Sequence, residues 1–215
     1  MSQRKYRYPA TTTVLAYSTA QDWKFVLMHK APYTLGKNGK WPNATYLQKS
    51  VVSICDETGV DLVLCGHDHM YLRTKSLYNN QLSQDGTVYV LNGTAGTKRY
   101  EIRSFLAGSF LDTNHIAGMA VQKNGYGNYW NGSDWNSTLQ TNIGGFFSGI
   151  SVNGGTLTMD AYILADHQDE QGQDIITKID TMTLSKTTGQ NTATYHGNNT
   201  TSKVAYVLQT VPSVL

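Results

Sequence analysis

The stretch that most constrains the fold of this chain is residues 61–74, DLVLCGHDHMYLRT. Its short apolar run, residues 62–65, is bounded by an acidic residue and a glycine, which predicts a fully buried β-strand. His67 and His69 follow directly, at the carboxyl end of the strand, where ligands bind in α/β sheets. Side chains at i and i+2 of an extended segment point to the same side, and neutral imidazole is the commonest metal ligand. We therefore expect a metal site here, although a His-x-His sequence on a polar loop also arises by coincidence.

A second stretch has the same organisation. Residues 23–33, WKFVLMHKAPY, contain the apolar run 25–28, which is followed by His29, and Pro32 then breaks any continuation. The pattern predicts another buried strand that delivers a histidine at its carboxyl end. Two strands that each end in a histidine are better explained by one metal-binding edge of a sheet than by two unrelated coincidences.

The residues between these strands have the pattern of a helix over 44–58. Asn43, preceded by Pro42, is expected to cap its amino end, and Gly59 stands where a left-handed residue ends many helices. Apolar residues recur at helical spacing and predict one apolar face, made of Leu47, Val51, Ile54 and Cys55. Strand, helix and strand in direct succession predict a right-handed βαβ unit with parallel strands.

Taken together, WKFVLMHKAPY and GVDLVLCGHDHMYLRT resemble the carboxyl-terminal half of a calcineurin-like metallophosphoesterase of the purple acid phosphatase-like branch. Residues 86–96 and 145–162 resemble the closing strands of that branch, so the resemblance covers most of residues 23–185. It implies an α/β fold, part of a four-layer α/β/β/α sandwich. One mixed sheet would carry the βαβ unit, and an antiparallel sheet would pack against it.

The resemblance also implies a chemistry. The family hydrolyses phosphate esters with two metal ions, of iron, zinc or manganese, that share a bridging solvent molecule. On this basis His29 and His67 would bind one ion and His69 the other. Lys30, beside the first histidine, and His115 are candidates for binding the phosphate ester, although a solvated loop explains Lys30 equally well.

The chain also departs from the family pattern. The motifs Asp-x-His, Gly-Asp-x-x-Asp and Gly-Asn-His-Asp/Glu, which supply the bridging carboxylate and further ligands, do not occur in it. Three histidines cannot fill two coordination spheres, because even a catalytic zinc ion takes three protein ligands. We therefore expect a truncated fragment that binds at most one ion by itself. A complementing amino-terminal half would lie upstream, and its loss would leave an exposed sheet edge and an exposed apolar face.

Four further residues are expected to serve the scaffold. Asp68 is expected to support its loop, and Arg73 to pair with a carboxylate inside the fold. Cys55 and Cys65 lie on apolar elements, so two buried thiols are expected, with a disulfide between them as the alternative.

Composition excludes some classes of partner. The net charge of +2 is too small to indicate nucleic acid or an anionic membrane as a partner. No apolar stretch is long enough to span a bilayer, and no secretory signal is visible. An extracellular or periplasmic location is implied by the resemblance alone.

Residues 1–22 are an uncertain amino-terminal segment, and residues 186–215 are a Thr- and Asn-rich linker with a terminal segment. Residues 122–142 are rich in Gly, Asn and aromatic side chains, including Trp130 and Trp135, and are interpreted as an insertion. These aromatic side chains either pack over the sheet or bind a glycan or a partner chain. The second case gives the alternative function, a non-catalytic binding or structural remnant.

Overall fold

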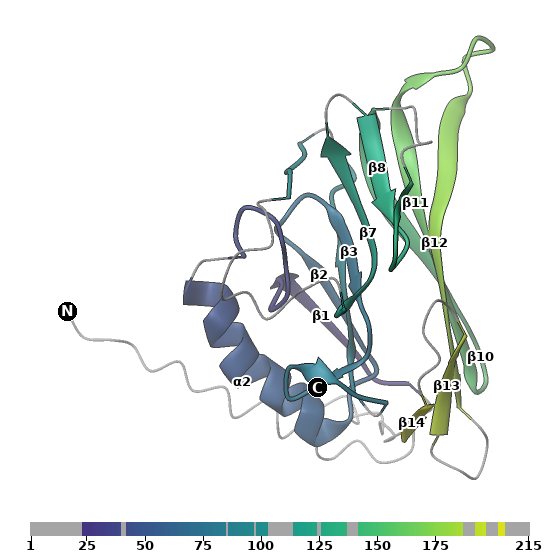
Figure 1. Cartoon of the computed structure of the whole chain (residues 1–215). Coiled ribbons are helices and arrows are strands. Elements are labelled where there is room, and N and C mark those ends of the chain that lie inside the picture. Colours follow the sequence, from purple (N-terminus) through teal and green to yellow (C-terminus); the bar gives the residue numbers. More distant parts are fainter. Residues whose placement is uncertain are drawn as a thin grey trace, which may run out of the picture.

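The computed structural model describes residues 23–39, 42–84, 86–96, 98–102, 114–123, 126–136, 142–186, 192–196 and 202–204. Within these ranges one helix and two sheets form three layers (Figure 1). The helix covers one face of a seven-stranded sheet, and a five-stranded sheet lies against the other face. The expectations for residues 1–22, and those for most of 186–215, fall outside the described residues.

The seven-stranded sheet is mixed, as predicted. Its strands, in spatial order, are β1 (Phe25–Lys30), β2 (Leu62–Gly66), β6 (Val88–Asn92), β3 (Tyr71–Thr74), β7 (Ile116–Lys123), β8 (Tyr126–Trp130) and β9 (Trp135–Asn136). β1, β2 and β6 are parallel to one another, and the remaining neighbours are antiparallel. A small hairpin of β4 (Leu77–Tyr78) and β5 (Gln81–Leu82) stands apart from this sheet.

The predicted βαβ unit is confirmed, with helix α2 (Pro42–Thr58) between the parallel strands β1 and β2. The expected start at residue 44, with Asn43 as the cap, is wrong. The helix already contains Pro42, whose fixed φ suits a first helical turn. The predicted carboxyl end is confirmed, because Gly59 has φ 62° and the Val60 N–H donates to the Cys55 carbonyl at 3.0 Å.

The second sheet is antiparallel throughout, as predicted. Its strands are β10 (Ile143–Asn153), β11 (Thr156–Gln168), β12 (Asp174–Lys186), β13 (Thr192–His196) and β14 (Ser202–Val204), in this spatial order. Gly154, with φ 52°, and Gly172, with φ 75°, lie in the two predicted turns between its long strands. The structure is therefore α/β, with one mixed and one antiparallel sheet.

Two apolar clusters lie between the layers. The first joins α2 to the seven-stranded sheet and includes Val52 and Cys55, both 1% exposed. The second lies between the sheets and includes Leu62, Phe146 and Met159. Neither Cys55 nor Cys65 is in a disulfide, and burial raises the pKa of the Cys65 thiol. Two buried thiols are what the sequence favoured.

β1 is not the buried strand that the apolar run predicted. It lies at the edge of the described sheet, and its burial alternates only weakly, with the Leu27 side chain 78% exposed. Leu27 shares a face with Phe25, which packs in the cluster between the sheets. Leu27 is therefore an apolar side chain on the inner face that the described part of the opposite sheet does not cover.

The aromatic stretch of residues 126–136 continues the sheet through β8 and β9. Trp130 packs against the cluster beneath α2, and Tyr129 packs against the cluster between the sheets. These contacts favour the packing interpretation for both side chains over a role in binding glycans. No described helix has the length and apolar character needed to cross a membrane.

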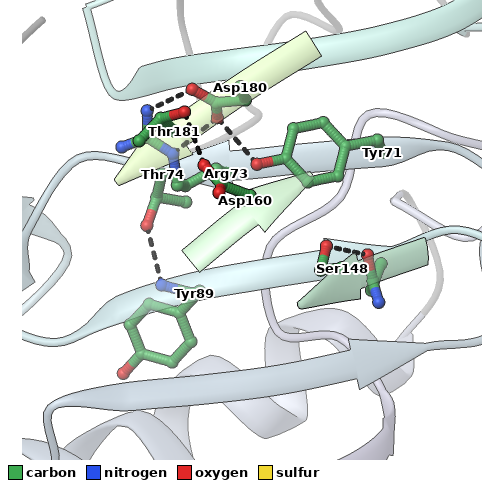
Figure 2. Close-up of polar contacts among 9 residues, drawn as sticks. Tyr71, Arg73, Thr74, Tyr89, Ser148, Asp160, Asp180 and Thr181 are labelled. Carbon is green, nitrogen blue, oxygen red and sulfur yellow. Dashed lines mark hydrogen bonds and ion pairs between the residues drawn. The ribbon is translucent and has the colours of Figure 1, made fainter. Parts of the chain in front are cut away.

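A buried ion pair joins the two sheets (Figure 2). The Arg73 side chain on β3 donates to both carboxylate oxygens of Asp180 on β12, with Nε to Oδ2 at 2.7 Å and Nη2 to Oδ1 at 2.9 Å. The Tyr71 hydroxyl also donates to Oδ2 of Asp180, at 2.7 Å. Burial, followed by the charge of Asp180, raises the pKa of Tyr71 well above its ordinary value, so the phenol stays protonated. Arg73 therefore serves the scaffold, as expected.

We predict that Asp180→Ala lowers the free energy of unfolding by about 3–5 kcal/mol, because it leaves the Arg73 guanidinium buried without a counter-charge. Urea denaturation measures the effect. Asp160→Ala is the matched control, since the Asp160 carboxylate contacts Lys178 Nζ at 3.5 Å and Thr181 Oγ1 at 2.7 Å and is itself 29% exposed. The control is expected to lose less than about 1 kcal/mol. Equal losses for the two variants would contradict a special role for the buried pair.

Candidate functional site

The carboxyl ends of β1 and β2 bring two histidines together. Because these strands are parallel neighbours, His29 and His67 reach the same edge of the sheet. His29 Nε2 lies 3.1 Å from His67 Nδ1, and the ring centroids are 4.9 Å apart at an interplanar angle of 74°. This is hydrogen-bonding distance, so in the absence of an ion one of these two nitrogens donates to the other, with the direction set by the tautomers.

A β-bulge in β1 lies at His29. Met28 pairs with Cys65 and Lys30 pairs with Gly66, so His29 is the extra residue on its strand. A bulge bends the strand that carries it and redirects a side chain, and bulges are common beside active sites. The apolar run in the sequence located this histidine at a strand end but contained no indication of the bulge.

His67 lies in a strained turn, and the extended His-x-His segment that the sequence suggested is wrong. Its φ is 76°, in the left-handed region, and the Asp68 N–H donates to the Gly66 carbonyl at 3.0 Å. This hydrogen bond closes a γ-turn of the rare form with positive φ. Strain of this kind persists where surrounding contacts impose it, and it concentrates at functional sites.

Asp68 supplies the contacts that hold this turn, as the sequence predicted. Its side chain is 1% exposed and accepts hydrogen bonds from Thr34 Oγ1 at 2.6 Å and from Asn38 Nδ2 at 2.6 Å. The Asn38 N–H also lies within hydrogen-bonding distance of both carboxylate oxygens. A Cβ on Gly36 would lie 2.8 Å from the carboxyl carbon, so only glycine fits there. Asp68 is thus committed to the loop that follows β1.

His69 is oriented by its other ring nitrogen. Because the Lys98 carbonyl can only accept, Nδ1 of His69 donates to it, at 2.9 Å, which leaves Nε2 as the nitrogen with a free lone pair. The ring also stacks on Tyr100, with centroids 4.7 Å apart and planes 16° from parallel. A hydrogen bond from Nδ1 to a backbone carbonyl is the usual way in which a metal-binding histidine is held.

The described residues do not complete a metal site. Among them, no group of three His, Cys, Asp or Glu side chains is placed to hold one ion. His29 and His67 are thus brought together, whereas His69 does not join them in a three-ligand group. Because a catalytic zinc ion takes three protein ligands, the pair fits part of a site and not the whole of one.

The electrostatics of the pair favour the neutral form that binds metal. Partial burial, followed by the nearby charge of His29, lowers the pKa of His67 below its ordinary value. Near neutral pH the His67 imidazole therefore keeps a lone pair for a metal ion.

The two candidates for substrate binding, Lys30 and His115, lie at opposite ends of the sheet. Lys30 ends β1 beside His29, is exposed, and contributes to the lowered pKa of His67. His115 lies at the other end of the sheet. It precedes β7, where Ile116 pairs with Thr74, and its carbonyl accepts the Lys75 N–H at 2.8 Å. β3 runs antiparallel to β6, so this end is opposite the histidine edge.

Some residues around the histidines escaped the sequence analysis. Thr34 and Asn38 hold Asp68, and Lys98 and Tyr100 hold His69. Their types are common on loops, and residues 98–100 follow a glycine-rich turn without any motif. The only signal in the sequence was their position after the strands that end at this edge.

Comparison with known proteins identifies no family from sequence. No family model matches the chain, and no curated protein matches it. A structure of the purple acid phosphatase PPD1 from yellow lupin (Lupinus luteus) seeds is similar over 85% of this chain and 28% of that chain, with 17% identity and a TM-score of 0.45. The chain thus spans less than a third of that protein.

We predict that His67→Gly is more stable than His67→Ala by about 1 kcal/mol, because glycine adopts the positive φ of the turn without strain. Both variants lack the imidazole, so chemical denaturation isolates the backbone effect.

Position 29 is the control for this comparison. His29 is on a strand and does not have a positive φ, so His29→Gly is expected to be less stable than His29→Ala by about 0.5–1 kcal/mol. The same order of stabilities at both positions would contradict a strained turn at His67.

Proposed function

We propose that this chain is part of a metal-dependent phosphoric ester hydrolase in which His29 and His67 bind one metal ion. The observation that carries the proposal is the distance of 3.1 Å between His29 Nε2 and His67 Nδ1. Two imidazole nitrogens on one tetrahedral zinc ion, with bonds near 2.0–2.1 Å, would be about 3.3 Å apart. The separation is therefore close to the one that an ion requires, and metal binding would replace the present contact as each ring turns its lone pair from the other ring toward the ion.

His69 would bind a second ion through Nε2. Its Nδ1 hydrogen bond to the Lys98 carbonyl, at 2.9 Å, supports this assignment because it holds the ring with Nε2 available. Iron, zinc and manganese are the candidate metals, from the resemblance of the two histidine stretches to metallophosphoesterases. Such ions, when bound, polarise phosphoryl oxygens and lower the pKa of bound water.

The remaining ligands would come from polypeptide outside the described residues, as a complementing amino-terminal half would provide. Two features support this part of the proposal. The described His, Cys, Asp and Glu side chains form no three-ligand group. In addition, β1 is the edge strand of the described sheet, and its Leu27 side chain is exposed on the face that an opposite sheet would cover. An extracellular or periplasmic location is proposed on the resemblance alone.

We predict that the chain alone binds at most one divalent ion per molecule. Elemental analysis after dialysis against zinc measures this stoichiometry. His67→Ala is expected to lose most of the bound metal, because one imidazole cannot hold an ion against solvent.

His115→Ala is the matched control, since His115 lies at the opposite end of the sheet, and it is expected to retain the metal. Two tightly bound ions per chain would show that further residues act as ligands. Metal retained in full by His67→Ala would contradict the assignment of the pair.

Hydrolysis itself is tested on the longest natural form of the protein, with an aryl phosphate as substrate and zinc, iron or manganese added. Turnover is expected, and His67→Ala is expected to reduce it by at least about a hundredfold, because the loss of a ligand exceeds the usual effect of losing an outer-shell partner. Inactivity with all three metals would remove the main support for a hydrolase.

A further inference from the structure

Two lysines from separate loops converge on one aromatic ring beside the histidines. Lys37, on the loop after β1, has its Nζ 5.7 Å from the centroid of the Tyr100 ring. Lys98, on the loop after β6, has its Nζ 5.5 Å from the same centroid. Both ammonium groups lie at the distance of a cation–π interaction, and both side chains are exposed.

The turn at residues 67–69 positions both loops. Asp68 holds the first loop through Thr34 and Asn38, the latter being the direct neighbour of Lys37. His69 holds the second loop in three ways: its Nδ1 donates to the Lys98 carbonyl, its carbonyl accepts the Tyr100 N–H at 3.0 Å, and its ring stacks on Tyr100. The convergence of the lysines is therefore built into the fold around the histidines.

Across the described ranges, neither Lys37 nor Lys98 forms an ion pair with an acidic side chain. The buried carboxylate of Asp68 is already occupied by Thr34 and Asn38, and Glu101 is exposed on the chain beyond Tyr100. An anion bound beside the Tyr100 ring would therefore be attracted by both ammonium groups.

We propose that Lys37, Lys98 and Tyr100 form an oxyanion-binding subsite that takes a phosphoryl group. The two ammonium groups supply charge and hydrogen-bond donors, and the Tyr100 hydroxyl supplies a further donor. Binding at this subsite does not require a metal ion. Its role in bringing a phosphate ester to the histidine edge rests on the proposed hydrolase function, whereas the binding of free phosphate or pyrophosphate does not.

The test uses the full chain after treatment with a chelator, so that no metal contributes. Isothermal titration with pyrophosphate at low ionic strength is expected to show saturable binding that weakens as salt is added. Lys37→Ala with Lys98→Ala in one protein is expected to raise the dissociation constant at least about tenfold, because the anion loses two charge-assisted hydrogen bonds. Zinc binding by the same double variant should be unchanged, because its histidines are intact.

Lys49→Ala is the control, since Lys49 is an exposed lysine on α2 and changes the net charge in the same direction. If Lys49→Ala weakens pyrophosphate binding as much as Lys37→Ala or Lys98→Ala alone, the binding depends only on the net charge of the protein. That result would overturn the proposal. An unchanged dissociation constant in the double variant would also overturn it. Loss of zinc binding in His67→Ala, with pyrophosphate binding intact, separates the metal site from the subsite.

Discussion

The parallel pairing of β1 and β2 is the interaction on which the candidate site depends. It places the carboxyl ends of two strands side by side, so that His29 and His67 meet although 38 positions separate them in the sequence. Helix α2 makes this pairing possible, because a parallel connection needs a crossover that returns the chain to the same end of the sheet. The helix end at Gly59 is closed by the hydrogen bond from Val60 to Cys55, which directs the chain into β2.

Three consecutive residues in the turn after β2 each have a separate structural role. His67 takes a positive φ and offers an imidazole, Asp68 is buried and ties down the loop after β1, and His69 ties down the loop after β6. The strain at His67 is therefore held in place by contacts on both sides of the turn. Such an arrangement holds the His67 side chain in one position, and the cost is conformational strain in the backbone.

Beyond this edge, the two sheets are held together by both apolar and ionic contacts. The apolar cluster between the sheets keeps water away from the Arg73–Asp180 ion pair. A buried pair of this kind stabilises the fold only when its polar atoms are hydrogen-bonded, and here both carboxylate oxygens of Asp180 accept from Arg73. This scaffold lies away from the histidines and supports the sheet that carries them. The apolar inner face of the seven-stranded sheet extends as far as its edge strand β1, where the Leu27 side chain is exposed.

Local patterns in the sequence were enough to predict the βαβ unit and the order of the main elements. Apolar runs, the glycine after the helix and the histidines after two strands were sufficient for the βαβ unit and for the edge at which a site would lie, because these patterns act between near neighbours. Which side chains meet at this edge depends instead on contacts between distant parts of the chain. The bulge at His29, the positive φ of His67 and the loop contacts of Asp68 and His69 depend on partners 29 to 38 positions away. Side-chain direction at a strand end is set by such distant contacts, and no local pattern of residue types encodes them.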